Sequence, residues 1–377
     1  MEQTAVEKKF GKYVMASMIT MFLQSAYSMI DGLFVSNLIG DTALSAVNVA
    51  WPVIAVVTAI GTGVGCGGAV MMSTKQGEGK NEESNIVRAN VILALLASSI
   101  VVTILFLVLL TPLLKLMGAE GELLRLSQIY GRVMLTGGVL QILSCGLTPL
   151  LRNDNRAVSA MMIMVGGLFA NLGLDFVFMY VFHMGIGGAA GASLCAQLFT
   201  TVCCLMILCT KKTDPIRLSQ FMIRKEYWKK IFKTAVSPFG ISLTPSLLIL
   251  YHNVACLKFG GDLAVNAYAL ISSTVGSYRV LLIGVAEGIQ PLASYAYGAH
   301  DFHAIRKIRN KAVITAMGVS FFLFIFTIAT ARFYPAIYGY EGEAAEFGYH
   351  AVMVTAAQLI FTGLPCDQFL FLFGWKR

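Results

Sequence analysis

Long apolar stretches constrain this chain more than any other feature. A helix that crosses a bilayer needs about 20 mainly apolar residues. Stretches of that kind lie near residues 14–37, 46–73, 89–112, 128–150, 157–182, 187–210, 231–257, 264–294, 312–333 and 347–373. Backbone polar groups must be satisfied internally within lipid, so such stretches form helices. The sequence therefore predicts an all-α polytopic membrane protein with about ten transmembrane helices.

Composition excludes several function classes. Hydrophobic residues make up 57% of the chain and charged residues 13%, against about 45–50% and about 25% in ordinary soluble domains. The eight cysteines lie in apolar stretches and form no CxxC or Cys/His metal spacing. No nucleophile elbow, metal pair or nucleotide-binding motif is present. We therefore expect no enzyme activity, cofactor or structural metal, and any transport would be ion-coupled or passive.

The basic residues predict the orientation. Loops on the N-terminal side of the membrane carry most of the 28 Lys and Arg residues. Opposite loops carry only Lys115, Arg125, Lys258 and Arg332. Cytoplasmic loops are enriched in Lys and Arg, so this asymmetry predicts a cytoplasmic N-terminus in the cell membrane. It also explains the pI near 9.0 through loops that face anionic lipid, and argues against nucleic-acid binding.

An internal repeat relates the two halves without gaps. A shift of 221 residues superimposes helix-turn residues and glycine-rich helix residues. The matches place Gly40, Asp41, Ala43, Ala46, Val64, Gly67, Ser73, Gly77 and Arg88 on Gly261, Asp262, Ala264, Ala267, Val285, Gly288, Ser294, Gly298 and Arg309. An even number of predicted spans separates the copies, so they are parallel repeats.

The repeat predicts two lobes. Residues 1–210 would form an N-terminal lobe of six helices, 211–233 a basic cytoplasmic linker, and 234–377 a C-terminal lobe of about four helices. Two complete copies would need about 440 residues, with twelve helices. We expect the last two helices to have been truncated; a natural ten-helix protein is the alternative.

Ionisable residues within spans are functional candidates, because they are costly in lipid. Asp31 and Asp175 each lie roughly 10 Å below the outer surface at 1.5 Å per helical residue. Asn171 precedes Asp175 by one turn on the same face. Ser193 falls roughly 8–10 Å below the start of its span, and Gln24 lies two turns below Asp31. These oxygen-bearing side chains are predicted to converge at one depth.

Two acids in a low-dielectric site suit ion coupling. They can hold a proton, because desolvation and mutual repulsion favour the neutral form. Asp31, Asn171 and Asp175 could instead bind Na⁺, which prefers oxygen ligands. The structural alternative is that Asp175 bonds a neighbouring helix and Asp31 caps a frayed end.

Four further residues are candidates for a substrate pathway. Glu287 and Arg279 lie two turns apart in the eighth predicted span, either as a structural pair or along the pathway. Met29 and Tyr268 are of the types that suit promiscuous sites, although both residues also occur on lipid-facing and core surfaces.

Four motifs resemble those of one transporter family: DGLFVSNLIGDTALSAVN, GLTPLLRNDNR, NLGLDFVFMYVFHMGIGGAAGASLCAQ and VAEGIQPLASYAYGA. The chain resembles the multidrug and toxic compound extrusion (MATE) family, and is most similar to its small bacterial multidrug exporters. The resemblance implies a two-lobed bundle of twelve helices. It also implies that the family's N-lobe ion site falls on Asp31, Asn171, Asp175 and Ser193.

The expected function is efflux of cationic or amphipathic drugs in exchange for H⁺ or Na⁺, with alternating access of two lobes in a monomer. Its partners would be small organic cations, the coupling ion and the lipid bilayer. Two alternatives stay open: a lipid-linked oligosaccharide flippase or polysaccharide exporter of the same superfamily, and an inactive truncated remnant.

Overall fold

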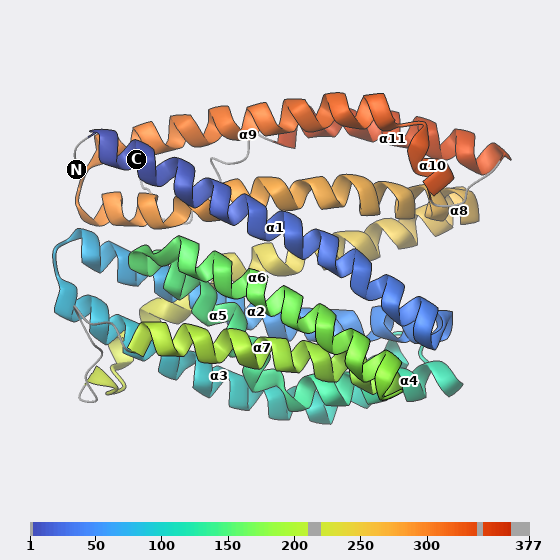
Figure 1. The fold of residues 1–377 in the computed structure, drawn as a ribbon, viewed down its shortest axis with the longest axis horizontal. Coiled ribbons are helices and arrows are strands. Elements are labelled where there is room, and N and C mark those ends of the chain that lie inside the picture. Colours follow the sequence, from blue (N-terminus) through green and yellow to red (C-terminus); the bar gives the residue numbers. More distant parts are fainter. Residues whose placement is uncertain (1–2, 210–219, 338–341, 363–377) are drawn as a thin grey trace. The chain divides into compact units, whose positions relative to one another are not determined.

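The computed structural model describes residues 3–209, 220–337 and 342–362, and within them the regular elements are helices (Figure 1). In chain order these are α1 Gln3–Ile39, α2 Asp41–Gly77, α3 Asn81–Leu116, α4 Gly121–Thr136, α5 Gly138–Leu151, the π-helical segment η1 Arg152–Arg156, α6 Ala157–Asp175, the π-helical segment η2 Phe176–Val181, α7 Gly185–Cys209, α8 Lys225–Gly298, α9 Phe302–Thr330, α10 Phe333–Ile337 and α11 Gly342–Thr362. The predicted all-α fold is confirmed.

The predicted spans fall on these helices. Five helical runs in the described part are long and apolar enough to cross a membrane: Thr42–Gly77, Asn81–Leu116, Gly138–Val181, Gly185–Cys209 and Phe302–Thr330. The run Gly138–Val181 contains nearly all of the span predicted at 157–182 and the second part of the span predicted at 128–150, because η1 joins α5 to α6 without a regular loop. Residues 363–373 of the last predicted span lie outside the described residues.

Two glycines that the repeat equates end the first span of each half. Gly40 separates α1 from α2 with φ 114° and ψ 167°, and Gly261 breaks α8 with φ 60° and ψ −158°. A residue with a Cβ atom would be strained in these backbone conformations, so both positions require glycine. Each repeat therefore begins with two helices joined at a glycine, as the repeated GD motif predicts.

Two other predicted spans are not regular helices throughout. The span predicted at 128–150 is interrupted at Gly137, where the Leu194 side chain of α7 occupies the space that a Cβ would need. The span predicted at 157–182 widens into η2 directly after Asp175. The apolar pattern of the sequence does not reveal these two irregularities, because they occur together with contacts to other helices.

Contacts divide the chain into two compact units. The N-terminal unit contains Leu23–Leu243 and Tyr297–His300. The C-terminal unit contains the described residues up to Phe22, Thr244–Ala296, and the described residues from Asp301 onward. Part of the linker predicted at 211–233 lies outside the described residues, and the predicted lobe boundaries stay a prediction.

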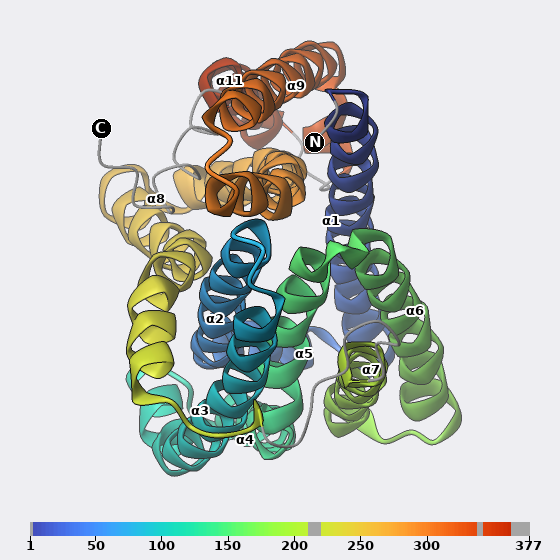
Figure 2. The same ribbon diagram turned by 90° about the vertical axis from the view of Figure 1, so that its left-hand side faces the viewer.

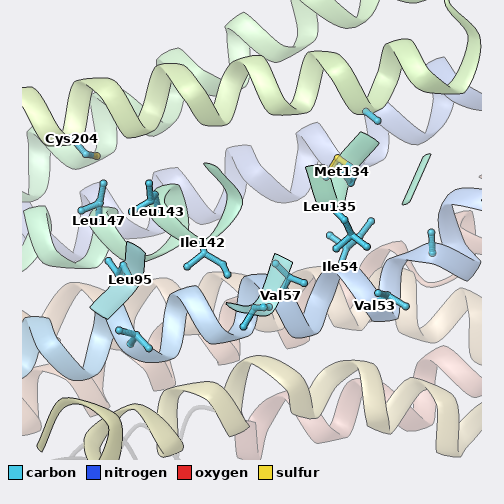
Figure 3. Packing of buried hydrophobic residues seen from close by; sticks show 14 of the residues in the cluster. Val53, Ile54, Val57, Leu95, Met134, Leu135, Ile142, Leu143, Leu147 and Cys204 are labelled. Atoms are coloured by element: carbon cyan, nitrogen blue, oxygen red, sulfur yellow. The ribbon is translucent and has the colours of Figure 1, made fainter. Parts of the chain in front are cut away.

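The N-terminal unit packs around α2. This helix contacts α3, α4 and α5, while α6 and α7 run side by side (Figure 2). In the core, Ile54 and Val57 of α2 join apolar side chains of α4 and α5 such as Leu135 and Ile142 (Figure 3). Close packing of this kind, rather than water exclusion, drives helix association in lipid.

Part of α8 also packs into the N-terminal unit. Ile231 and Ala235 belong to its core. A methyl group placed on Gly67 of α2 would lie 2.8 Å from the backbone nitrogen of Ala235. The two helices therefore cross with their backbones in contact, and the crossing requires glycine.

The C-terminal unit contains the matching crossing. A methyl group on Gly288 of α8 would lie 2.6 Å from the Cα of Val14 in α1. The 221-residue shift converts Gly67 into Gly288 and Val14 into Ala235, so the two contacts are equivalent. The unit boundaries after Phe22 and Leu243 differ by the same shift. In each unit, the first half of one repeat's first helix therefore packs against the second helix of the other repeat.

At both crossings, replacing the glycine by a residue with a larger side chain should destabilise the protein. Gly67→Ala and Gly288→Ala should each lower the stability of the protein by about 1–3 kcal/mol, because the added methyl meets backbone atoms that cannot turn away. Thermal unfolding of the purified chain in detergent measures the change. Gly318→Ala in α9 is the control, since nothing lies within 4 Å of its added Cβ. If the three variants unfold at the same temperature, the crossings are not tightly packed.

Candidate functional site

The candidate ion site is built on α6 in the N-terminal unit. Asn171 and Asp175 lie one turn apart and are 5% and 0% exposed. The Asn171 amide Nδ2 donates a hydrogen bond of 3.2 Å to Asp175 Oδ2. Asp175 is the last residue before η2, and π-helical turns of this kind frequently occur at functional sites. The predicted shared face of Asn171 and Asp175 is thus present.

Asp31 brings a second carboxyl from α1. Its Oδ1 atom is buried, and its carboxyl lies within hydrogen-bonding reach of Asp175. A deprotonated carboxylate only accepts hydrogen bonds. Two carboxylates in such contact therefore need a proton shared between them or a cation beside them. The convergence of Asp31, Asn171 and Asp175 agrees with the sequence prediction, while its role in ion coupling stays a prediction.

Tyr130 of α4 is a member of this site that the sequence analysis missed. It is 5% exposed and lies within electrostatic range of both the Asp31 and the Asp175 carboxyls. Its hydroxyl can donate to a carboxylate or accept from a protonated one. Hydropathy gives no signal for it, because only the packing of the unit brings Tyr130 of α4 within electrostatic range of Asp31 and Asp175.

Ser193 of α7 lies at the level of the acids. The antiparallel contact between α6 and α7 sets Gly167 against Thr200 and Phe178 against Gly188, and this register places half-buried Ser193 opposite residues 171–175. One turn further on, Gln197 has a buried Oε1 with no hydrogen-bond partner in the described part of the chain. Ser193 and Gln197 could therefore contribute oxygens at the depth of the site.

The remaining predicted site residues are Gln24, Met29, Arg279, Glu287 and Tyr268. Gln24 is exposed on α1, and the Met29 side chain lies outside the described residues. In the C-terminal unit, Arg279 is exposed and Glu287 half-buried. Tyr268 is half-buried and stacks on His252, with ring centroids 5.1 Å apart.

A metal centre of the usual kind is not found. In residues 3–209, 220–337 and 342–362, no group of three or more His, Cys, Asp or Glu side chains could hold a metal ion. An alkali cation at Asp31 and Asp175 would take its other oxygens from amides, hydroxyls or water. Asn171 and Ser193 are of the types that can supply them.

A second polar cluster lies at one end of the N-terminal unit. Arg88 of α3 pairs with Asp154 of η1 at 2.9 Å, and both side chains are buried. Gln76 of α2 donates a further bond of 3.0 Å to the same Asp154 oxygen. The turn of η1 that presents Asp154 continues into Asn155 at φ 65°. The cluster therefore ties α2, α3 and η1 together.

Exposed charges continue the α2–α3 connection beyond this cluster. Lys75 bonds Glu78 and Glu83, each at 2.9 Å. The hydrogen bond from Lys75 lowers the pKa of the Glu78 carboxyl, and Lys80 contributes in the same direction. Exposed pairs of this kind contribute little stability, because solvent screens their charges.

These features define the class of the protein. It is a multi-pass helical membrane protein with a repeat-related crossing in each unit and a carboxyl pair held among its helices. The chain belongs to the MatE family, whose model matches residues 16–177 and 241–369.

Relatives and solved structures agree with this assignment. The multidrug export protein MepA of Staphylococcus aureus (strain N315) is 24% identical over 370 residues, which cover 96% of this chain and 80% of that protein. MepA of Staphylococcus saprophyticus is 22% identical over 365 residues, with the same coverage.

Among solved structures, a multidrug resistance MATE family transporter of the MOP superfamily in an outward-facing conformation has a TM-score of 0.91 at 24% identity, covering 97% of this chain and 82% of that chain. A MOP superfamily transporter from Pyrococcus furiosus, reported to have a binding pocket of reverse polarity, has a TM-score of 0.90 at 24% identity and the same coverage. At this identity the likeness shows the fold.

The buried Arg88–Asp154 pair predicts a strong asymmetry between single and double substitutions. Arg88→Leu or Asp154→Leu alone should destabilise the protein by about 3–5 kcal/mol, because an uncompensated charge stays buried. The double variant should recover much of that loss. Thermal unfolding in detergent measures both.

Glu122→Gln provides the control, since Glu122 and Arg125 form an ion pair of 2.6 Å that is exposed on both sides. It should leave the stability nearly unchanged, because solvent screens an exposed pair. Additive losses in the double variant would contradict the proposed dependence of each charge on the other.

Proposed function

We propose that this protein exports cationic and amphipathic drugs across the cell membrane in exchange for H⁺ or Na⁺. The named relatives are multidrug export proteins, which supports the class of cargo. The observation that carries the exchange mechanism is the contact between the Asp31 and Asp175 carboxyls inside the N-terminal unit.

The chemistry of that contact favours ion exchange. Asp175 is fully buried, so removing a proton or cation from the pair leaves negative charge in a low-dielectric site. A cationic drug can compensate that charge when it enters, and the returning H⁺ or Na⁺ can compensate it when the drug leaves. Coupling requires that each ligand bind the two access states with different affinity.

Helix α1 is suited to link the site to the rest of the protein. It contributes Asp31 to the N-terminal unit, whereas its residues up to Phe22 belong to the C-terminal unit. Ion or drug binding at Asp31 therefore acts on a helix that both units contain. We propose that this helix carries the response of one unit to the other during alternating access.

We also propose that the N-terminus lies in the cytoplasm. The predicted cytoplasmic connections meet at one end of the N-terminal unit: Gln76 bonds Asp154, and the Arg224 backbone donates to Asn90 Oδ1 at 3.1 Å. This clustering supports an orientation in which the basic loops face anionic lipid. We take the protein to act as a monomer, without a cofactor and without catalytic chemistry.

An accumulation assay tests the function. Pump-deficient, energised cells that express this chain should accumulate less ethidium than cells with an empty vector. Asp31→Asn should abolish that difference, because the amide cannot exchange a proton and carries no charge. Glu122→Gln, an exposed acid outside the site, should export like the unaltered chain.

Ion dependence separates the two coupling ions. A protonophore should stop export if H⁺ drives it, and removal of Na⁺ should stop it if Na⁺ does. Undiminished export by Asp31→Asn would refute the coupling role. Equal accumulation in all strains, with the protein confirmed in the membrane, would refute ethidium export by this chain and favour another cargo or an inactive protein.

A further inference from the structure

The first helices of the two repeats carry the same basic pattern near their starts. Residues 8–12 read KKFGK and residues 229–233 read KKIFK, and the 221-residue shift superimposes the three lysines. The first segment lies on α1 in the C-terminal unit, and the second lies on α8 in the N-terminal unit. Each unit therefore carries one copy of the pattern.

The buried faces of the two helices also agree. Phe10 and Val14 are buried on α1. The shift places them on Ile231 and Ala235, which are buried on α8. Val14 and Ala235 are the residues that meet the glycines at the two helix crossings. The opposite face of each helix is therefore free of these packing contacts over the same stretch.

That opposite face combines lysines with apolar side chains on α8. Lys229 and Lys233 are exposed, and Phe232 and Val236 are 41% and 67% exposed. These four residues follow the i, i+3, i+4, i+7 spacing of one helix face. Exposed apolar side chains on a helix that enters a bilayer contact acyl chains, so the lysines lie at the polar end of a lipid-facing surface.

Helix α1 repeats this arrangement. Lys12 is exposed, and Met15 and Ile19 on the same face are 56% and 43% exposed. The Lys8 side chain lies outside the described residues. Both helices thus present positive charge followed by an exposed apolar strip that leads away from the helix start.

The charges on these faces are not compensated within the part of the chain that the structure describes. Glu226, the acid closest in sequence to the α8 lysines, already pairs with Lys230 at 2.6 Å. Lys229, Lys233 and Lys12 form no ion pair with the described residues. An anionic group outside the protein can therefore approach them without displacing an internal partner.

We propose that each face binds an acidic phospholipid of the cytoplasmic leaflet, with the phosphate at Lys229 and Lys233 on α8 or at Lys12 on α1. A lysine ammonium pairs with phosphate as a point charge, and its methylene stem lies along apolar surface. A soluble anion would leave Phe232 and Val236 uncovered, whereas an acyl chain covers them. The choice of leaflet rests on the proposed cytoplasmic position of the N-terminus.

Tryptophan fluorescence provides a reporter for the α8 site. Trp228 is half-buried, and its ring meets that of Phe232 with centroids 6.0 Å apart. Trp51→Phe and Trp375→Phe leave it as the single tryptophan of the full chain. The purified protein is placed in phosphatidylcholine vesicles that contain a minor share of dibrominated phosphatidylglycerol, or the same share of dibrominated phosphatidylcholine. Bromine quenches the reporter when the lipid occupies the site.

Brominated phosphatidylglycerol should quench Trp228 more strongly, with an affinity about tenfold above that of phosphatidylcholine. Lys229→Gln together with Lys233→Gln should bring the two affinities close to equality, because a lysine near anionic lipid contributes roughly fivefold in affinity. Lys229→Arg together with Lys233→Arg keeps the charge and should keep the preference.

The α1 site is tested with a reporter at the matching position. Gly11 is the residue that the shift places on Phe232, and nothing lies within 4 Å of a Cβ added to it. Gly11→Trp in a chain whose own tryptophans are replaced by Phe should show the same preference for phosphatidylglycerol. Lys12→Gln should weaken that preference about fivefold.

Lys80→Gln is the matched control for α8. Lys80 is also exposed on the N-terminal unit, but it is paired with Glu78 at 3.0 Å. It should leave the preference at Trp228 unchanged. Equal quenching by the two brominated lipids, or an equal loss in Lys80→Gln and in the double Gln variant, would overturn the proposed site. Either result leaves the proposed drug export standing, since ethidium accumulation tests that separately.

Discussion

The close crossing of helix backbones at glycines organises this protein. Gly67 meets Ala235 in the N-terminal unit, and Gly288 meets Val14 in the C-terminal unit. A side chain at either glycine would collide with backbone atoms of the other helix. The two helices at each crossing therefore lie closer together than side-chain packing would allow. Helices α1 and α8 are each divided between the two units, and Asp31 of the candidate ion site lies on the part of α1 that belongs to the N-terminal unit.

Two buried acids illustrate how burial serves different purposes. Asp154 faces Arg88 and Gln76, so its charge is compensated by the protein itself and the cluster fastens three helices. Asp175 faces Asn171 and another acid, so its compensation must come from a proton or a cation. The first arrangement needs no exchangeable ligand. The second requires an exchangeable ligand, which is the property that the proposed ion exchange needs.

The sequence predicts much of the candidate ion site because depth in a bilayer can be counted along a helix. Asp31 and Asp175 lie within hydrogen-bonding reach of each other, as their similar predicted depths indicate. The antiparallel register of α6 and α7 sets Ser193 opposite residues 171–175. Tyr130 could not be predicted in this way. Its position depends on how α4, which ends just before Gly137, packs within the unit, and hydropathy carries no information about that packing.

The amino-acid sequence by itself determines the membrane class, the helical secondary structure, the repeat and the turns at Gly40 and Gly261, since each depends on residues close together in the chain or on a fixed shift. Only the tertiary structure decides that the repeats exchange the first halves of their first helices, and that His252 stacks on Tyr268. Glycine permits a close approach to any helix. Which helix approaches is decided by the packing of the whole unit.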